Sequence, residues 1–376
     1  MSEKWQKVTN KQHYVPRLLL RNFGVSGSDK QVGIYNLRTD LYCPVASLAH
    51  QAQRHRFYGE QEIEHALGDM ETSAARFVKP AVRDRCLPPR ASEGHRALVT
   101  FAFLQAVRTP YAAAESDEQI EALFRRVACD NPGAEWLLEE FATYRKTTPV
   151  RNLATAVHLV HLAQDLGYKL LCNNTSVPFV LSDHPAVLYN QFLEPLISDA
   201  SITGFAARGL QLFLPLSPRH TLVFFDRDIY DVGGRNTKPS LVSVFDPEDV
   251  HALNRLQAVS AEECLYFNHE ADAGYIRSVA AGAAPFRRSS KGFLHEHLPF
   301  GETAGLLIEQ GRMDIRTGLR LRMLRTSRRS GRHLPGPAGV PVRDPCAVAA
   351  VQEWADGIFG AEPLRVIRAD PVSPQS

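Results

Sequence analysis

Apolar residues in the first half of the chain recur with the period of a helix. In the stretch EQEIEHALGDMETSAARFVKP, Ile63, Leu67, Met70, Ala74 and Phe77 follow one another at steps of three or four residues. This spacing places the five side chains on one face of an amphipathic helix. The pattern therefore predicts a long helix that buries this face against the rest of the protein.

Three further helical patterns follow this helix. The first, EGHRALVTFAFLQAVRTP, comes after Ser92, a residue type that caps helices, and stops near Pro110. A second is expected over about 115–145, with a break at DNPG, and a third in NLATAVHLVHLAQDLG. Gly167 is the expected C-cap of the third helix.

From residue 168 onwards the pattern changes to short strands. The stretches YKLLCNN, PFVLSD, AVLYN, LQLFLPLS and TLVFFD are rich in β-branched and aromatic residues and are separated by turn residues. Asp246 and Pro247 then start another helix, as its N-cap and first residue, before CLYFN returns to strand. A helical block followed by a β-rich block, without regular βαβ alternation, predicts an α+β fold.

We expect one domain over residues 1–285. In it, a mainly helical part at about 46–167 packs on an antiparallel or mixed β-rich part at about 168–285. Residues 286–345 are rich in arginine, proline and glycine and are expected to form a basic, partly disordered linker. Residues 346–376 are expected to form a short helix and a tail.

Composition narrows the class of protein only a little. The chain has 376 residues, of which 44% are hydrophobic and 22% charged, with a formal net charge of +2. These values are ordinary for a globular protein, and they neither favour nor exclude nucleic-acid binding. No two of the six cysteines form a CxxC pair, and the polar start MSEKWQKVTNKQ contains no apolar signal region. We therefore expect a cytoplasmic protein with reduced thiols and no membrane span.

The stretch SDHP at residues 182–185 is the first candidate for chemistry. It follows a strand of buried character, so the carboxylate of Asp183 would be held rigidly, as suits a metal ligand or a general base. An aspartate before a turn also accepts hydrogen bonds from backbone amides, and the proline would enforce that turn. Both interpretations of Asp183 stay open at this stage.

Further candidates lie on the expected helices. Glu64 and Glu71 are seven residues apart, so both lie on one helix face beside apolar residues, where a carboxylate needs a partner or a metal. Glu64 is also a first-turn acid of the kind that the helix dipole favours, which makes Glu71 the better candidate. Arg108 sits at the expected end of an apolar helix and can pair with a phosphate or a carboxylate.

Two other patterns carry weaker signals. His158, His161 and Asp165 form an HxxHxxxD pattern whose steps could build a metal site, although helical histidines are more often packing or surface residues. Eight arginines lie between residues 312 and 332. They could contact phosphates, but no aromatic residues are interleaved for base stacking, and a solvated linker is the simpler interpretation.

Several ordered motifs together resemble a bacterial family catalogued as domain of unknown function 4238. The motifs in this chain are HYVPRLLLRNF at 13–23, RFYGEQEIEHALGDMETSAA at 56–75, QAVRTP at 105–110, NNTSVPFVLSDHP at 173–185, FLPLSP at 213–218 and LNRLQA at 253–258. The resemblance covers about residues 11–285. The chain departs from the family pattern at Arg17, where glutamine is frequent, and at His184, where asparagine is frequent.

The resemblance implies a set of polar positions rather than an activity. These positions are His13, Glu71, Arg108, Asp183 and Asn254. Apolar residues around His13 would anchor the opening segment in the core and fix the imidazole at a cleft shared by the motifs.

A histidine, two carboxylates and an arginine suit metal-assisted attack of water on a phosphodiester. The leading hypothesis is therefore an intracellular phosphodiesterase or nuclease-like hydrolase that acts on a nucleic acid or nucleotide. Glu71 and Asp183 would hold Mg²⁺ or Mn²⁺. His13 would be the general acid or base, and Arg108 would bind the phosphate.

Two other hypotheses stay open. The first is a non-catalytic binding module, in which the motif residues cap helices and join the two blocks. The second is a metalloenzyme that modifies a small molecule, with His158, His161 and Glu71 around iron or zinc.

Overall fold

The computed structural model of the chain describes residues 11–359, except residues 60, 132, 234–239, 298–306 and 336–338. Most of the helices precede residue 167 and most of the strands follow it, which confirms the predicted α+β class. The helices are α1 Arg17–Asn22, α2 Gln61–Asp84, α3 Glu93–Gln105, α4 Pro110–Asp130, α5 Trp136–Tyr144, α6 Thr148–Leu159, α7 Pro247–Ser260, α8 Ala273–Ala283 and α9 Pro345–Phe359. The strands are β1 Lys11–His13, β2 Gln31–Asn36, β3 Leu41–Ser47, β4 Gln53–His55, β5 Gly167–Asn173, β6 Leu181–Ser182, β7 Val187–Tyr189, β8 Gln211–Ser217, β9 His220–Phe225, β10 Tyr230–Val232, β11 Leu241–Val244, β12 Cys264–Phe267, β13 Gly292–His297, β14 Leu307–Arg312 and β15 Leu324–Thr326.

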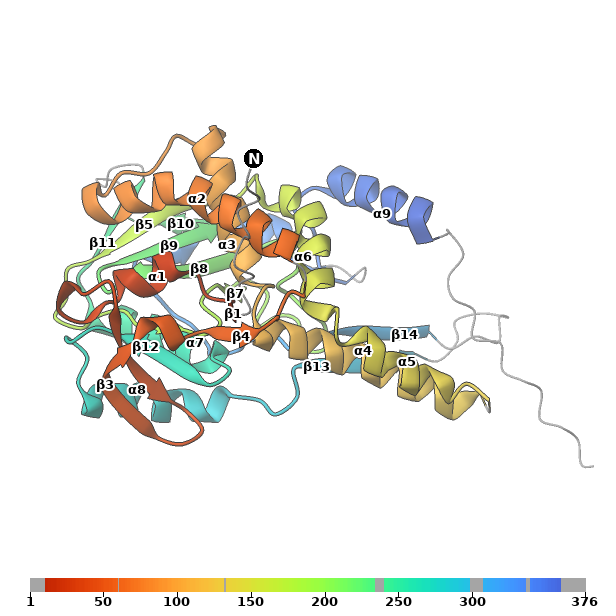
Figure 1. Cartoon of the computed structure of the whole chain (residues 1–376). Coiled ribbons are helices and arrows are strands. Elements are labelled where there is room, and N and C mark those ends of the chain that lie inside the picture. Colours follow the sequence, from red (N-terminus) through yellow and green to blue (C-terminus); the bar gives the residue numbers. More distant parts are fainter. Residues whose placement is uncertain are drawn as a thin grey trace, which may run out of the picture.

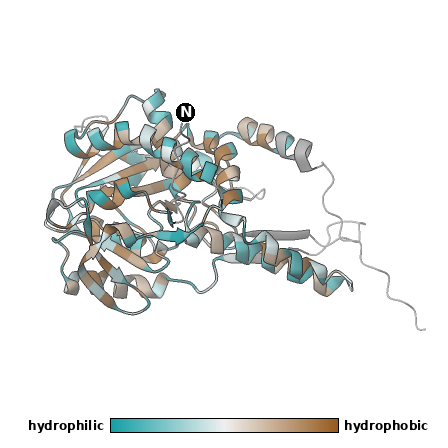
Figure 2. Cartoon of the chain, viewed as in Figure 1, coloured by the Kyte–Doolittle hydropathy of each residue, from teal (hydrophilic) through white to brown (hydrophobic). Residues whose placement is uncertain are grey.

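Two sheets organise the described part of the chain. A five-stranded sheet has the order β11-β5-β9-β8-β7, and a four-stranded sheet has the order β3-β2-β12-β6. In the larger sheet all neighbours are antiparallel except β11 and β5, so the sheet is mixed. Every residue of β8 and β9 is buried, as expected for strands covered on both faces. Figure 2 shows this apolar character as brown strands in the central sheet.

Helix α3 fills the space between α2 and the larger sheet. It is apolar around most of its circumference, and nine of its thirteen residues are buried, which is typical of a core helix. Phe103 is fully buried and packs against Phe205 and against Phe224 of β9, with ring centroids 4.8 and 6.0 Å apart. Figure 1 shows α2 and α3 together on this face of the sheet. The core therefore lies between the helical part and the β-rich part of the chain.

Helix α7 joins the two sheets through buried polar side chains. Asn254 accepts a hydrogen bond from the backbone of Val180 at 2.9 Å and donates one to the carbonyl of Pro178 at 2.8 Å. Gln257 accepts from the backbone of Ser182 and donates to the carbonyl of Pro185, both at 2.9 Å. The helix thereby fixes the backbone of the PFVLSDHP stretch on both sides of Asp183.

Several local predictions are confirmed and others need correction. Ser92 and Asp246 cap α3 and α7 as predicted. The break at DNPG separates α4 from α5, also as predicted. Thr109, however, is an N-cap and Pro110 the first residue of α4, so this pair starts a helix instead of ending one. Gly167 belongs to β5 and not to a helix C-cap.

The described parts of residues 286–345 contact the fold at many points. They contain β13, β14 and β15, and Leu319, Leu321 and Leu324 are buried in the core beside the larger sheet. Arg316 donates hydrogen bonds to the carbonyls of Glu194 and Ile197 at 3.0 and 2.6 Å. Arginines in this range thus hold backbone carbonyls, a role that a count of arginines does not reveal. The division into a domain and a linker stays a prediction.

An arm extends away from the two sheets. Helices α4 and α5 run beside one another, and the β13–β14 pair packs along α4 (Figure 1). The first turn of α4 lies at the base of this arm, where the arm meets the sheets. None of the helices in the described part of the chain combines the length and apolar character that crossing a bilayer requires.

Replacing Phe103 with alanine should destabilise the whole fold, because it removes the largest apolar contact between α3 and β9. We expect the free energy of unfolding to fall by about 3–5 kcal/mol in a urea titration. Val157→Ala is the matched control, since Val157 is 56% exposed. A loss below about 1 kcal/mol for Phe103→Ala would show that α3 does not carry the core.

Candidate functional site

Arg108 is the centre of a buried polar cluster, the Arg108 cluster, formed with His13, Tyr58, Glu64 and Glu71. The guanidinium is 1% exposed and donates to the Glu71 carboxylate at 2.7 Å, the Tyr58 hydroxyl at 3.1 Å and the His13 carbonyl at 2.8 Å. The Tyr58 hydroxyl in turn donates to the Arg108 carbonyl at 2.8 Å. Burial opposes the charge, but Tyr58 and Glu71 raise the pKa of Arg108 above its usual range, so it stays a cation. The cluster ties β1, α2 and the end of α3 together.

Two atoms of the Arg108 cluster have no hydrogen-bond partner among the described residues. They are Nε2 of His13 and Oε2 of Glu64, and both are buried. Burial, and then Arg17 and Arg108, lower the pKa of His13 to about 4, so the imidazole is neutral at physiological pH. Burial raises the pKa of Glu64, although Arg108 opposes this shift.

Asp183 has a different environment from these residues. Its carboxylate is 2% exposed and accepts hydrogen bonds from the backbone N–H groups of Glu262, Glu263 and Cys264 at 2.7, 2.8 and 3.0 Å. Burial raises its pKa to about 6, and the three N–H donors limit the rise because they favour the ionised form. The carboxylate therefore fastens the residues between α7 and β12 to the end of β6.

Three of the four residues predicted to form the site converge, and the fourth does not contact them. His13, Glu71 and Arg108 belong to one cluster, whereas within the described residues Asp183 has no hydrogen bond or ion pair with any of them. In the part of the chain that the structure describes, no group of three or more His, Cys, Asp or Glu side chains is placed to hold a metal. A metal bound by Glu71 and Asp183 stays a prediction.

The residues that directly follow Arg108 and Asp183 in the chain contact each other. Thr109 comes directly after Arg108, and His184 directly after Asp183. A hydrogen bond of 2.5 Å joins Oγ1 of Thr109 to Nδ1 of His184. The RTP and SDHP motifs therefore meet at the N-terminus of α4.

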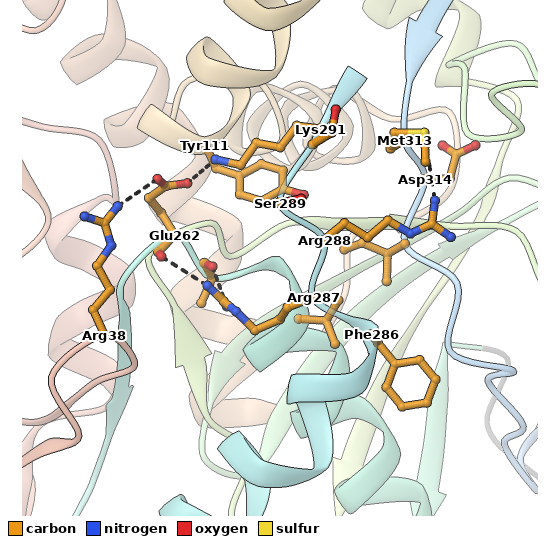
Figure 3. Close-up of a pocket in the computed structure, with 14 residues that line it drawn as sticks. Arg38, Tyr111, Glu262, Phe286, Arg287, Arg288, Ser289, Lys291, Met313 and Asp314 are labelled. Atoms are coloured by element: carbon orange, nitrogen blue, oxygen red, sulfur yellow. Dashed lines mark hydrogen bonds and ion pairs between the residues drawn. The ribbon is translucent and has the colours of Figure 1, made fainter. Parts of the chain in front are cut away.

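Two adjoining cavities open beside His184. The water cavity has a volume of about 30 Å³ and the ligand cavity about 190 Å³. Both are lined by Tyr111, Met313, Asp314 and Ile315, which form the wall between them. A cavity of about 30 Å³ is large enough to hold a water molecule. The ligand cavity, drawn in Figure 3, has room for a small anionic group.

His184 and Glu115 both line the water cavity. The His184 ring stacks on Tyr111 with centroids 4.6 Å apart, and burial, Lys291 and Arg312 lower its pKa to about 3. Burial, opposed by Arg312, raises the pKa of Glu115 to about 7. No hydrogen bond within the described residues contributes to this shift of the Glu115 carboxyl group. A neutral imidazole and a half-protonated carboxyl group at neutral pH thus share a space that can hold a water molecule.

Cations from distant parts of the chain line the two cavities: Arg312 lines the water cavity and Lys291 the ligand cavity. Nζ of Lys291 lies 4.5 Å from the centre of the Tyr111 ring and 2.5 Å from the Glu262 carboxylate. The backbone N–H of Lys291 donates to Glu118 of α4 at 2.5 Å, which holds this segment against the helix. The N-terminus of α4 adds positive potential beside His184, because its first N–H groups point towards the cavity end of the helix.

The remaining sequence candidates lie elsewhere. Nδ1 of His161 contacts the carbonyl of His158 at 2.7 Å, and Asp165 forms an ion pair with Arg343 at 2.8 Å. Asn254 is buried and holds backbone groups, as described above for α7. The iron or zinc site proposed for His158, His161 and Glu71 stays a prediction.

Sequence reasoning did not find Glu115 or Lys291. Glu115 was placed at the start of an expected helix, where an acid has an ordinary role. Reading Thr109 and Pro110 as an N-cap and first residue would have put Tyr111 and Glu115 four residues apart on one face of α4. No local signal marks Lys291, because its partners Glu262 and Tyr111 are distant in the sequence.

Comparison with known proteins gives one result. The family model described as a protein of unknown function, DUF4238, matches residues 11–271. This match covers more than half of the chain, so the protein belongs to that family. No significant match was found among curated proteins or among solved structures. The family region contains the Arg108 cluster, Asp183, His184 and Glu115, whereas Lys291 and the 312–315 wall follow it in the chain.

Asp183→Asn should reduce stability, because the amide cannot accept three N–H bonds without presenting its own NH₂ to a donor. We expect the free energy of unfolding to fall by about 2–3 kcal/mol in a urea titration at neutral pH. Asp69→Asn on the exposed face of α2 is the matched control and should change stability by less than about 0.5 kcal/mol. Equal stability of both variants would contradict the anchoring role of Asp183.

Proposed function

We propose that the protein is a hydrolase that cleaves a phosphodiester at the junction of the two cavities. The observation that carries this proposal is the water cavity, in which Glu115 lies with His184 beside a larger cationic cavity. A carboxyl group with a pKa of about 7 is suited to accept a proton from water at neutral pH.

In the proposed reaction, Glu115 and His184 hold a water molecule against the phosphorus atom of a substrate at the junction of the two cavities. Glu115 takes a proton as the water oxygen bonds to phosphorus, and the ester oxygen leaves with its bonding electrons and is protonated by solvent. Lys291, Arg312 and the N-terminus of α4 would stabilise the charge on the phosphoryl oxygens. This scheme draws on the residues of the chain alone.

The Arg108 cluster and Asp183 have a supporting part in this proposal. Arg108 and Asp183 directly precede Thr109 and His184 in the chain. Their contacts therefore fix the backbone at these two residues. The other assignment gives the chemistry to His13, Glu71, Arg108 and Asp183 with Mg²⁺ or Mn²⁺. It requires Glu71 and Asp183 to exchange their present partners for the metal, which is why we favour Glu115.

Glu115→Gln should lower kcat/KM for the model substrate bis(p-nitrophenyl) phosphate by about 10²–10⁴-fold, since a general base contributes that much to catalysis. Glu139→Gln on the exposed face of α5 is the matched control and should leave the rate unchanged. Loss of activity in Glu71→Gln and on chelation of divalent metal, with full activity in Glu115→Gln, would support the other assignment. A wild-type rate no higher than that of Glu115→Gln would favour a non-catalytic binding module.

The pH dependence gives an independent check of Glu115. The base must be ionised, so kcat/KM should rise with pH and level off above about 7. Because burial raises the folded-state pKa above that of the unfolded chain, protonation favours the folded state. The contribution of Glu115 to stability should therefore fall between pH 4.5 and about 7. Glu115→Gln should lack this fall in urea titrations across that range, and the same slope in both proteins would contradict the assignment.

A further inference from the structure

The ligand cavity carries more positive than negative charge. Its lining includes the cations Arg38, Arg287, Arg288 and Lys291 and the carboxylates Glu262 and Asp314. The formal charge of the lining is therefore +2. Arg38 also pairs with Glu263 outside the lining at 3.2 Å, so the excess positive charge lies on Arg287 and Arg288 and matches a dianionic group. Segment 286–291 supplies three of the four cations and lies beyond the family match, which ends at residue 271.

Both carboxylates of the lining are already engaged. Glu262 pairs with Lys291 at 2.5 Å and with Arg38 at 3.4 Å. Asp314 accepts from the backbone N–H of Ile202 at 2.6 Å and from the Thr203 hydroxyl. Neither acid pairs with the two consecutive arginines of the segment in the described residues.

The charge of Arg287 is not neutralised by any carboxylate that the structure describes. Its guanidinium donates to the backbone carbonyls of Ala258 and Ala261, each at 2.7 Å, and to that of Glu262 at 3.3 Å. Carbonyl groups satisfy its donors but carry no formal charge, so a positive potential remains in the cavity.

Most of the hydrogen-bond donors of Arg288 have no acceptor among the described residues. Arg288 is exposed, and in the described part of the chain its side chain makes one weak hydrogen bond, from Nη1 to the sulfur of Met313 at 3.9 Å. Figure 3 shows Arg287 and Lys291 extending towards Glu262, while Arg288 extends the other way towards Met313 on the wall shared with the water cavity. A planar guanidinium with free donors is well suited to bind phosphate through two parallel hydrogen bonds.

We propose that the ligand cavity is a subsite for a terminal phosphate monoester, bound by Arg288, so that the substrate is a phosphodiester with a second phosphate next to the one that is cleaved. The inference rests on the proposed function for the position of the reacting group. A phosphate monoester carries close to two negative charges at neutral pH, as the +2 lining requires. The cleaved phosphate would lie at the junction of the two cavities, and the terminal phosphate further along the ligand cavity beside Arg288.

The first test compares two model substrates, a dinucleotide with a terminal phosphate and the same dinucleotide without it. The wild-type protein should show about tenfold or more higher kcat/KM for the phosphorylated form. Arg288→Gln should remove this preference, so that the variant cleaves the two dinucleotides with similar kcat/KM. Arg328→Gln, the same charge change at an exposed arginine outside both cavities, should keep the preference.

Binding of pyrophosphate, measured by calorimetry, separates this inference from the proposed function. Arg288→Gln should weaken binding about tenfold or more, whereas Glu115→Gln should bind as the wild type does or more tightly. If Glu115→Gln retains hydrolysis while Arg288→Gln loses binding, the subsite stands and the catalytic assignment fails. Absence of binding in the wild type, or equal losses in Arg288→Gln and Arg328→Gln, would overturn the subsite.

Discussion

The buried guanidinium of Arg108 is the interaction on which the arrangement around α4 depends. A charge that is 1% exposed needs acceptors for its donors, and a carboxylate, a hydroxyl and a backbone carbonyl from three separate elements supply them. Because these partners come from β1, α2 and the segment before it, the position of the chain at Arg108 is fixed from several directions. Because Thr109 directly follows Arg108, its position is fixed as well, and it starts α4 at the edge of the water cavity.

Asp183 fixes the backbone of the SDHP stretch, as Arg108 fixes the backbone of the RTP stretch. Three backbone N–H groups hold its carboxylate, and Gln257 of α7 holds the residues on either side of it. The two anchors belong to different parts of the α+β fold, the helical block and the smaller sheet. The hydrogen bond between Thr109 and His184 therefore spans the junction of these parts, where ligand sites are frequently built.

The outer wall of the two cavities comes from the chain beyond the family region. Segment 286–291 and residues 312–315 contribute most of the cations and of the shared wall, while Arg38, Glu115, Tyr111 and His184 come from within that region. The arginine-rich sequence therefore has a role in the structure, since some of its arginines donate hydrogen bonds to carbonyls and Arg288 faces the ligand cavity.

The sequence by itself determined the α+β class and the caps at Ser92 and Asp246, because periodicity and capping residues are local properties of the chain. Only the tertiary structure decided that Asp183 turns to backbone amides and that Lys291 reaches Tyr111 and Glu262. It also decided which neighbours raise or lower the pKa of Glu115. These are contacts between residues far apart in the chain, and packing of whole elements sets them, so no local pattern encodes them.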